Sequence, residues 1–524
     1  MRRNQMGAVG GILLDASVLL VADEDENGNA SLRPGAENML RKLHHSKIHM
    51  GISYGLGLSA YKVSLLERMA RLYSFDCLIL NASSIDNTAN EIALAWVENG
   101  RNFIHVVSNE NEDLFLNLTN HGWLIIILRS PGQGSADDVE RGGASENSSK
   151  LYINKLEELP LTICHLNRKA LGSDSMTVGY VMKPSRTEDF AKRGAFPLYP
   201  TQNGLIFLPL TFELPMSSQL QEVDIVLHKA TDEIISIEMS KSSEFSNKIT
   251  YTRGMQELER FIEHQPDCCV IDPLNNIYPV LDRLKIQQIL LGLESLNMEG
   301  RCKIRAPHFL KVDNFNEPNF VQRLLEAKLS LPTIVKPQVA CGVADAHSMA
   351  IVFRVEDYKD LSVPLPAVLQ EYVDHSSSLF KFYVLGEKVF HAVKKSMPNA
   401  DILIKLSERN ELKPLLFDSL KSLPTAEKTP NFGDGDLLHK VNDQCIDLGL
   451  VTEAASWLRR MLDLTIFGFD VVIQEGTGDH VIVDVNYLPS FKEVPDNVAI
   501  PAFWEAIKKK YESRKTKQAT IASS

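Results

Sequence analysis

Residues Phe467–Ser490, FGFDVVIQEGTGDHVIVDVNYLPS, form two apolar stretches separated by a Gly-Thr-Gly-Asp turn, a pattern that predicts a β-hairpin. Because side chains alternate along a strand, Asp484 and Asn486 point to the same face. If the two strands pair in an antiparallel manner, Asp470 lies beside them. Two carboxylates and one amide oxygen form the hard, oxygen-rich site that magnesium prefers. The alternative is a hairpin whose polar residues face water, and the pattern leaves both interpretations open.

The composition is that of a folded protein with several domains. The chain has 524 residues, of which 44% are hydrophobic and 23% are charged, and this length predicts about three domains. The seven cysteines include no C-x-x-C pair, so we expect reduced thiols in the cytoplasm or nucleus, with neither a zinc site nor a disulfide framework. The net charge of −12 argues against a general nucleic-acid binder. It leaves room for a local cationic cluster that binds a small anionic substrate.

The N-terminal segment has some features of a secretory signal. Arg2 and Arg3 precede a mainly apolar run, MGAVGGILLDASVLLVA. Asp15 interrupts this run and the acidic residues 23–26 follow it at once, so we predict a buried strand instead. No other stretch approaches the roughly twenty apolar residues of a membrane helix, and we expect no membrane partner.

Residues 1–130 alternate strand-like and helical stretches, which predicts an α/β domain with a parallel sheet. The stretches LLDASVLL, LRPGAENMLRKL and HMGIS resemble the Rossmann-like, haloacid-dehalogenase-like fold, with Asp15 after the first strand and Ser53 after the second. Phosphatases of that family carry a second aspartate two residues after the nucleophile as general acid, and this chain has Ser17 there. Because the leaving group lacks this proton donor, we expect the domain to be non-catalytic.

Composition also indicates the next boundaries. Residues 131–175 begin with a stretch rich in Gly, Ser and acidic residues and are predicted to be a linker. The short apolar segment LYINKLEELPLTICHL at residues 151–166 either packs back on the first domain or extends the linker, and the sequence leaves both open. Residues 176–305 resume the alternation as a further α/β domain, in which Lys183 ends the strand-like MTVGYVMK, Arg186 follows it, and His228 and Lys229 end the strand-like VDIVLHK. The ends of parallel strands are where open α/β sheets bind ligands. Residues 306–512 form the last predicted domain.

Two lysines in that last domain suggest phosphate binding. Lys336 leaves the strand-like LPTIVK beside a loop with Gly342, the arrangement expected where an ammonium and backbone N–H groups bind nucleotide phosphates. The loop is not a Walker motif, because no G-x-x-x-x-G-K-[ST] occurs in the chain. Lys381 lies within the apolar LFKFYVLG and needs a partner, since burying an unpaired ammonium is costly. In VLQEYV, the backbone of a connecting strand can bind an adenine edge.

The motifs IVKP, QEYVDHSSSLFKFYVLG, FGFD and VDVNYLP occur in an order that resembles the ATP-grasp fold. More narrowly, Met176–Lys509 is similar to the inositol 1,3,4-trisphosphate 5/6-kinase family, also called the inositol-tetrakisphosphate 1-kinases. The segments that carry this resemblance are VGYVMKPSR, DIVLHKATD, VIDPLNNIYPVLDR, VACGVADAHSMAIVF and FGFDVVI. The resemblance implies an ATP-grasp kinase that follows a haloacid-dehalogenase-like domain, as in long plant members.

The resemblance implies a role for each matching residue. The positions that match ATP contacts are Arg283, Lys336, Gln370, Glu371, Tyr372, Val373, Ser396 and Ser419, of which Gln370–Val373 form the adenine-binding connection. The positions that match inositol phosphate ligands are Arg186, His347, Lys381, Asn486 and Ser490, with Lys183 as a nearby substitute for Arg186. Asp470, Asp484 and Asn486 match the ligands of magnesium, for which two ions are expected. No side chain is assigned as a general base.

Two departures from the family pattern lie on the substrate side. The family commonly has N-x-x-P-G after the second aspartate, whereas NYLPS places Ser490 at the glycine position. A side chain there can crowd the inositol phosphate or add a hydrogen bond. The family has His or Asp before the glycine of the loop that precedes His347, and this chain has Cys341. Both changes bear on which isomer is preferred.

The implied enzyme uses ATP and magnesium to phosphorylate a hydroxyl of an inositol tris- or tetrakisphosphate, with a reverse reaction through ADP that interconverts isomers. Catalysis is then mostly positioning and electrostatic stabilisation. The alternatives are an ATP-grasp carboxylate ligase, which forms an acyl phosphate, and a non-catalytic inositol phosphate-binding protein. We expect a cytoplasmic monomer, with a disordered basic tail at residues 513–524 as a weak nuclear-localisation candidate.

Overall fold

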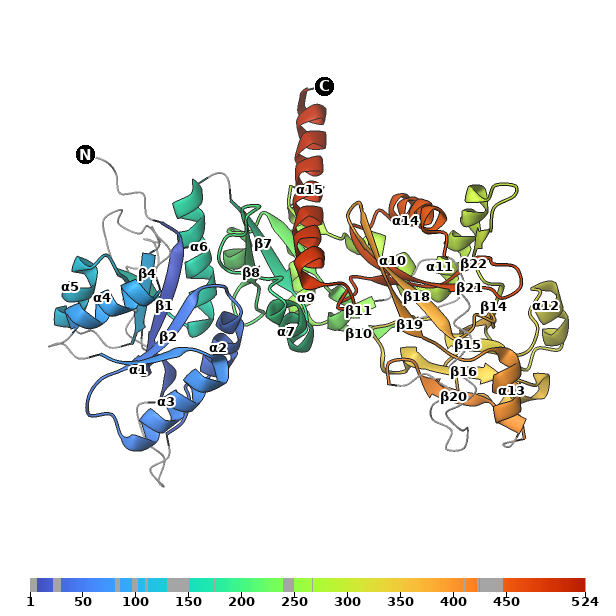
Figure 1. Cartoon of the computed structure of the whole chain (residues 1–524), viewed down its shortest axis with the longest axis horizontal. Coiled ribbons are helices and arrows are strands. Elements are labelled where there is room, and N and C mark those ends of the chain that lie inside the picture. Colours follow the sequence, from blue (N-terminus) through green and yellow to red (C-terminus); the bar gives the residue numbers. More distant parts are fainter. Residues whose placement is uncertain are drawn as a thin grey trace. The chain divides into compact units, whose positions relative to one another are not determined.

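A computed structural model gives the structure of residues 7–21, 30–80, 85–96, 102–108, 112–129, 150–172, 175–238, 249–265, 267–408, 411–421, 424 and 446–523. The chain divides into two compact units. The first comprises residues 1–227 and 260–269, and the second comprises residues 228–259 and 270–524. Figure 1 labels the helices and strands of both units.

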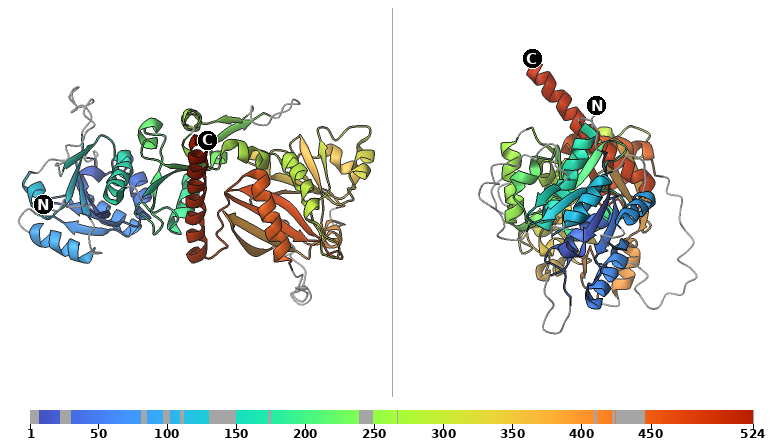
Figure 2. Two further views of the ribbon diagram at one scale, coloured as in Figure 1. Left: turned by 90° about the horizontal axis from the view of Figure 1, so that it is seen from above. Right: turned by 90° about the vertical axis from the view of Figure 1, so that its left-hand side faces the viewer.

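The first unit contains a six-stranded parallel sheet in the order β3-β2-β1-β4-β5-β6. Helices cover both of its faces, with α2 and α3 packed together and α4 and α5 packed together (Figures 1 and 2). The predicted parallel α/β architecture is therefore confirmed. The strands are β1 Val9–Asp15, β2 His49–Tyr54, β3 Asp76–Ile79, β4 Asn102–Val107, β5 Leu124–Leu128 and β6 Lys150–Ile153. The helices are α1 Ala16–Leu19, α2 Ala36–His44, α3 Ala60–Tyr73, α4 Ile85–Ala95, α5 Glu112–Asn120 and α6 Leu159–Leu171.

Asp15 lies at the end of β1, where its carboxylate holds two neighbouring segments. Its Oδ1 accepts the N–H of Ser17 at 2.9 Å and thereby caps α1. Its Oδ2 accepts from Ser53 Oγ of β2 at 3.3 Å, and Ser53 Oγ lies 3.3 Å from Nε2 of the buried His105. The Ser17 hydroxyl accepts the N–H of Ser108 at 3.0 Å. Ser17 stands where a phosphatase of this family has its proton-donating aspartate. Its hydroxyl therefore joins the end of β1 to the end of β4.

The structure differs from the predicted linker over residues 131–175. Strand β6 extends the six-stranded sheet in parallel with β5, and α6 packs beside β1. Asn167 of α6 is fully buried and accepts the N–H of Val9 at 2.6 Å. The apolar segment at residues 151–166 therefore packs on the first sheet, one of the two alternatives that the sequence left open. The polar stretch before it, residues 130–149, lies outside the described residues.

A four-stranded sheet has the order β12-β9-β7-β8. Helix α7 begins directly after β7, with Lys183 as its N-cap residue and Arg186 in its first turn. Both basic residues are thus at the carboxyl end of a strand, as the sequence predicts. The strands are β7 Met176–Val181, β8 Leu205–Pro209, β9 Ile225–His228 and β12 Cys269–Ile271, and the helices that follow them in the chain include α7 Pro184–Lys192, α8 Met216–Leu220 and α9 Arg253–His264.

The second unit is built on two five-stranded sheets, with the orders β14-β17-β15-β16-β20 and β13-β22-β21-β18-β19. Neighbouring strands are antiparallel except for β13 and β22. The strands are β13 Ile304–Arg305, β14 Phe309–Val312, β15 Thr333–Pro337, β16 Ser348–Val352, β17 Ala367–Glu371, β18 Ser378–Leu385, β19 Lys388–Lys395, β20 Leu415–Asp418, β21 Ile466–Ile473 and β22 His480–Tyr487. A separate pair is formed by β10 Ile234–Ile237 and β11 Ile249–Tyr251. The helices are α10 Leu274–Leu281, α11 Arg283–Leu290, α12 Phe320–Glu326, α13 Ala400–Glu408, α14 Leu448–Leu462 and α15 Asp496–Ser523.

The hairpin predicted for Phe467–Ser490 is present as β21 and β22. Its antiparallel register pairs Asp470 with Asp484, so the expected placement of these two residues is confirmed. In the turn, Gly476 and Gly478 have φ angles of 81° and 73°, which glycine adopts without the steric penalty of a side chain. Local sequence therefore sets both the turn and the position of the carboxylates.

The C-terminal residues differ from the predicted disordered tail, because residues 513–523 continue α15. This helix begins in the core, where Phe503 and Ile507 are fully buried. Its later residues are mostly good helix formers, so a helix that is nucleated by packing extends into the charged segment. In the part of the chain that the structure describes, no helix combines the length and the apolar character needed to cross a membrane.

Asp272 is fully buried and joins the end of β12 to the start of β21. Its two carboxylate oxygens both accept the N–H of Thr465 at 2.9 Å, and one also accepts that of Ile466 at 3.3 Å. Burial raises the pKa of Asp272 to about 6, although these hydrogen bonds oppose the shift. The carboxylate thus satisfies backbone donors that have no water to bond.

We predict that Asp272→Ala lowers the free energy of unfolding by about 1–3 kcal/mol, because two buried N–H groups lose their acceptor. Chemical denaturation of the full chain measures this change. Asp463→Asn is the control, since this carboxylate is 73% exposed and pairs with Lys510 at 3.0 Å, and asparagine tolerates the φ of 46° at this position. Its loss is expected to change stability by less than about 0.5 kcal/mol. Equal losses in the two variants would contradict the role given to Asp272.

Candidate active site

Asp470 and Asp484 are register partners on β21 and β22. Lys381 of β18 is the partner of Asp470 on its other side, and its Nζ lies 3.3 Å from Asp470 Oδ2. Burial raises the pKa of Asp470 to about 6, while Lys381 opposes this shift and Asp484 adds to it. The partner that Lys381 was predicted to need is therefore Asp470.

Asn486 is exposed and completes the polar face of the hairpin. Its Nδ2 donates to Asp484 Oδ2 at 3.0 Å. Carboxylate and amide oxygens are the hard donors that magnesium binds, so the chemistry of Asp470, Asp484 and Asn486 fits this cation. Among the described residues no group of three or more His, Cys, Asp or Glu side chains is placed to hold a metal ion. The candidate cation site therefore consists of two acids and an amide.

Lys336 of β15 connects the two sheets of the second unit. Its Nζ donates to Gln370 Oε1 of β17 at 2.8 Å and to Val483 O of β22 at 3.4 Å. Burial lowers the pKa of Lys336 to about 8, while Asp484 opposes this shift. An ammonium group held beside the hairpin in this way is well placed to bind a phosphate.

Arg283, at the start of α11, is buried, and its guanidinium holds the loop after β15. Its terminal nitrogens donate at 2.6–3.3 Å to the carbonyl oxygens of Pro337, Val339, Ala340 and Ala346. Burial lowers the pKa of Arg283, and the nearby Asp484 opposes this shift. The sequence predicts that Arg283 contacts phosphate. In this structure its donors serve the loop at residues 337–346.

His347 and Ser419 lie together at the end of that loop. The imidazole Nδ1 is 3.1 Å from Ser419 Oγ, and the N–H of Ser419 donates to His347 O at 3.1 Å. Burial lowers the pKa of His347, with Arg283 acting in the same direction. Cys341 belongs to the same loop, and burial raises the pKa of its thiol. His347, which is predicted to bind the inositol phosphate, is therefore in contact with Ser419, which is predicted to bind the nucleotide.

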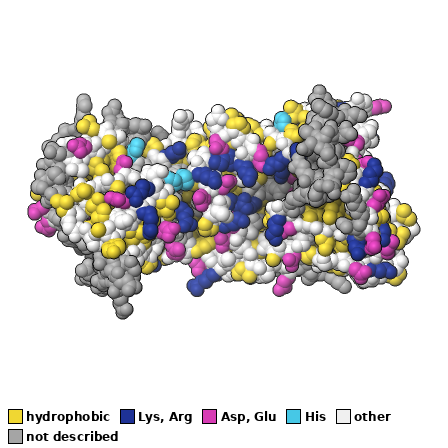
Figure 3. Space-filling view, turned by 60° about the horizontal axis from the view of Figure 1, so that its bottom comes forward, with side chains coloured by type: hydrophobic (Ala, Val, Ile, Leu, Met, Phe, Trp, Pro, Cys, Tyr) yellow, Lys and Arg dark blue, Asp and Glu magenta, His cyan; other side chains and the backbone are white. Residues whose placement is uncertain are grey.

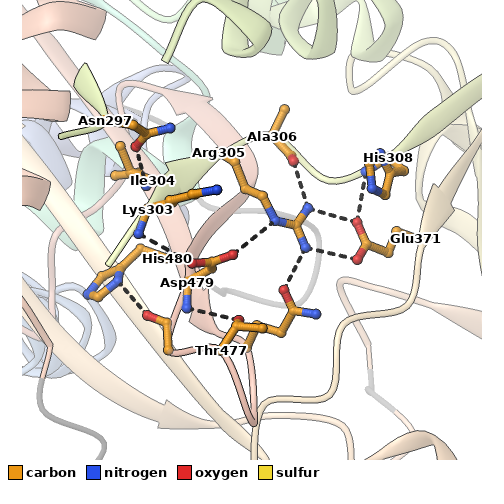
Figure 4. Close-up of polar contacts among 12 residues, drawn as sticks. Asn297, Lys303, Ile304, Arg305, Ala306, His308, Glu371, Thr477, Asp479 and His480 are labelled. Carbon is orange, nitrogen blue, oxygen red and sulfur yellow. Dashed lines mark hydrogen bonds and ion pairs between the residues drawn. The ribbon is translucent and has the colours of Figure 1, made fainter. Parts of the chain in front are cut away.

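The first half of the connection, Gln370 and Glu371, is held by charged partners. Gln370 is buried and accepts from Lys336. The carboxylate of Glu371 accepts both terminal nitrogens of Arg305 at 2.9 Å (Figure 4). Burial alone would raise the pKa of Glu371, but Arg305 and the N–H of His308 together lower it. The Glu371 side chain and its N–H, which donates to His308 O at 2.8 Å, are thus occupied within the protein.

The second half, Tyr372 and Val373, packs into two small apolar clusters. Val373 O accepts from His375 Nδ1 at 2.6 Å, and His375 Nε2 lies 2.9 Å from Ser396 Oγ. No hydrogen bond donated by the Val373 N–H is found among the described residues. Ser396 therefore acts on the connection through His375, and its direct contact with a nucleotide stays a prediction.

The remaining predicted substrate residues are Arg186 and Ser490. Arg186 belongs to the first unit, whereas the other predicted site residues belong to the second. Ser490 follows the end of β22 and precedes Phe491, which is fully buried. Their roles as inositol phosphate ligands stay predictions.

Lys229, noted in the sequence only as a basic residue at the end of a strand, lies against the hairpin. Its Nζ donates to Tyr487 O and lies 4.6 Å from the centre of the Tyr487 ring. The Tyr487 hydroxyl donates in turn to His228 O. The available signal was its position directly after β9, since basic residues at the carboxyl ends of sheet strands often face a ligand.

Family models match three successive parts of the chain. Residues 298–504 match the "Inositol 1,3,4-trisphosphate 5/6-kinase ATP-grasp domain", residues 177–277 match the pre-ATP-grasp domain of the same family, and residues 6–169 match "ITPK4, N-terminal HAD-like domain". Inositol-tetrakisphosphate 1-kinase 6 of Oryza sativa subsp. indica is 52% identical over 516 residues, which cover 97% of this chain and 91% of that protein. The chain belongs to the inositol 1,3,4-trisphosphate 5/6-kinase family. Inositol-tetrakisphosphate 1-kinase of Danio rerio is 27% identical over 299 residues, or 56% of this chain and 69% of that protein.

Membership of the inositol 1,3,4-trisphosphate 5/6-kinase family confirms the predicted fold class and enzyme class, a kinase with an ATP-grasp domain. It also confirms the haloacid-dehalogenase-like domain. That match extends to residue 169, beyond the predicted end at residue 130, and includes β6 and most of α6. The ATP-grasp fold identifies ATP as a substrate.

We predict that Arg283→Met speeds amide hydrogen exchange of residues 337–346 about tenfold, because the loop carbonyls lose their charged donor. Exchange followed by mass spectrometry on the full chain measures this change. Lys285→Met is the matched control, since Lys285 lies on the same helix and is exposed. Unchanged exchange of the loop in the Arg283 variant would refute the role of the guanidinium.

Proposed function

We propose that this chain transfers the γ-phosphoryl group of ATP to a free hydroxyl of an inositol tris- or tetrakisphosphate, releasing ADP and a proton. The observation that carries the proposal is the pairing of Asp470 with Asp484 on the hairpin, with Lys381 and Lys336 beside them. This arrangement supplies an oxygen-rich cation site next to ammonium groups that can bind phosphate.

Asp470, Asp484 and Asn486 would hold magnesium, as two ions or one. The cation would supply charge neutralisation and orientation at the ATP phosphates. Lys381 already balances the charge of Asp470 at 3.3 Å. A bound cation would balance this charge in place of Lys381, and the lysine would then be able to turn toward an anionic substrate, in line with its proposed role as an inositol phosphate ligand.

On the nucleotide side, the connection would bind the adenine through its backbone, and Lys336 would bind phosphate. The N–H of Val373 and the carbonyl of Glu371 are the groups of that backbone suited to an adenine edge. Ser396, which contacts His375, and Ser419, which contacts His347, would add further nucleotide contacts. Arg283 would set the shape of the loop that faces the phosphates and would contact them once the loop releases it.

On the acceptor side, the inositol phosphate would be bound by His347, Asn486 and Ser490 of the second unit. The role of Arg186, in the first unit, stays a prediction from the family resemblance. The ring of His347 has a lowered pKa, so near neutral pH it can donate one hydrogen bond without adding a full charge. Lys and Arg side chains also gather in clusters on the face shown in Figure 3, although the chain carries a net charge of −12. Local cationic clusters of this kind bind polyanions even on an acidic protein.

The two alternatives to a kinase named from the sequence predict different assay results. An ATP-grasp carboxylate ligase would release phosphate only when an acid and an amine are both present. A non-catalytic binding protein would bind inositol phosphates without turnover, and the serine at position 490 in place of the family's glycine is the feature that favours it.

The deciding experiment is incubation of the purified chain with ATP, magnesium and a panel of inositol tris- and tetrakisphosphates, with the product isomers resolved by chromatography. We expect phosphorylation of at least one isomer and slow reversal with ADP. Binding without turnover on any isomer would exclude the kinase function.

We predict that Asp484→Ala reduces magnesium-dependent turnover at least about a thousandfold, because charge stabilisation at the transferred phosphoryl group is lost. Asp401→Ala is the control, since this carboxylate is 65% exposed on α13 and pairs only with Lys405 one turn away among the described residues. Near-normal turnover of a folded Asp484 variant would overturn the metal assignment.

A further inference from the structure

Arg305 is the centre of a polar network that no part of the proposed chemistry uses (Figure 4). Its terminal nitrogens bind both carboxylate oxygens of Glu371 at 2.9 Å, and one of them also donates to Gln474 Oε1 at 2.8 Å. Its Nε lies 4.0 Å from Asp479 Oδ2. Both members of the central ion pair are largely buried, with side chains 17% and 14% exposed.

The partners of Arg305 come from different sheets. Arg305 lies on β13, which pairs with β22, the strand that carries Asp484. Glu371 ends β17 in the other sheet, opposite Thr333 of β15. Gln474 and Asp479 belong to the hairpin turn, residues 474–479, between β21 and β22. The guanidinium therefore joins the connection to the turn of the hairpin on which the proposed cation site lies.

The same turn is fastened a second time just beyond the connection. The N–H of Glu475 donates to Asp374 O at 2.9 Å, and the Glu475 carboxylate accepts from Asn399 Nδ2 at 2.7 Å. The Oδ1 of Asn399 accepts the N–H groups of His375 and Ser376 at 3.0 and 2.9 Å. Hydrogen bonds to the hairpin turn thus fix the chain on both sides of Tyr372 and Val373.

We propose that Arg305 is a positioning residue for nucleotide binding: through Glu371 and the hairpin turn it fixes the adenine-binding connection relative to the proposed cation site. This inference rests on the proposed function and adds to it a residue that touches neither substrate. A bidentate Arg–carboxylate pair has the geometric specificity for this task, because its two parallel hydrogen bonds restrict rotation as well as distance. The nucleotide spans the connection and the cation site, so a displaced connection weakens the binding of ATP.

The test compares Arg305→Met with Arg301→Met in the full chain. Arg301 also forms a bidentate pair, with Asp447 at 2.7 and 2.9 Å, and its side chain is 27% exposed, but this pair fastens the start of α14. We expect Arg305→Met to raise both the KM for ATP and the Kd for ADP with magnesium about tenfold. The kcat and the KM for the inositol phosphate are expected to stay within about twofold of the wild type, and Arg301→Met is expected to change none of these values.

Two further variants separate positioning from general stability. Arg305→Lys keeps the charge but loses the bidentate geometry, so its Kd for ADP is expected to lie between those of the wild type and Arg305→Met. In the double variant Arg305→Met, Glu371→Gln, the Kd for ADP is expected to match that of Arg305→Met alone, because both changes break one interaction. If Arg305→Met fails to fold, Arg305→Lys and Glu371→Gln decide the question through the same binding measurement.

Unchanged nucleotide affinity in the Arg305 variants would overturn the inference, as would an equal loss in Arg301→Met or an equal rise in the KM for the inositol phosphate. The failure of the proposed function is a separate result, namely that the wild type binds ADP with magnesium but phosphorylates no inositol phosphate. In that case ADP affinity alone still decides the role of Arg305.

Discussion

The second unit depends on how the charge of two neighbouring carboxylates is balanced. Asp470 and Asp484 are partners on adjacent strands, and burial together with the neighbouring Asp484 makes it costly to ionise Asp470. Lys381 lies on the opposite side of Asp470, and Lys336 lies close enough to both acids for each to affect its pKa. The negative charge of the carboxylates must therefore be balanced by nearby positive charge, either from the two lysines alone or from a bound cation as well. A site that attracts cations and is bordered by lysines also attracts a phosphate chain that carries its own cation.

The two sheets that provide these groups are joined by polar side chains rather than by apolar packing alone. Lys336 bridges β17 and β22, and Arg305 bridges β17 and the hairpin turn. Asp272 and Arg283 satisfy backbone groups in buried places, one at the start of β21 and the other in the loop after β15. Hydrogen bonds to charged side chains are directional, so they fix the relative position of the two sheets more narrowly than hydrophobic contacts do. That property suits a site whose chemistry depends mainly on positioning.

The features predicted correctly from the sequence are those with a local signal. The hairpin follows from two apolar stretches around a glycine-containing turn, and the need of Lys381 for a partner follows from its apolar surroundings. The order of several short motifs identified the family. In contrast, Arg305 and Glu371 are 66 residues apart, Asp272 and Thr465 are 193 apart, and Lys229 and Tyr487 are 258 apart. Nothing in either local sequence marks such a pair. Arg283 binds backbone carbonyl oxygens. Because every residue has a backbone carbonyl, the residue types in the sequence do not indicate which ones Arg283 binds. The helical end of α15 was missed because its charged composition suits both a solvated helix and a disordered tail.

The central claim is that the hairpin carboxylates hold the cation of a bound nucleotide. A crystal structure of the full chain with manganese and a non-hydrolysable ATP analogue tests it most directly, because manganese can be located by its anomalous scattering. The account predicts an anomalous peak within bonding distance of Asp470 and Asp484, with the analogue's phosphates next to Lys336 and its adenine against residues 370–373. A peak elsewhere, or an analogue bound away from the hairpin, would contradict it.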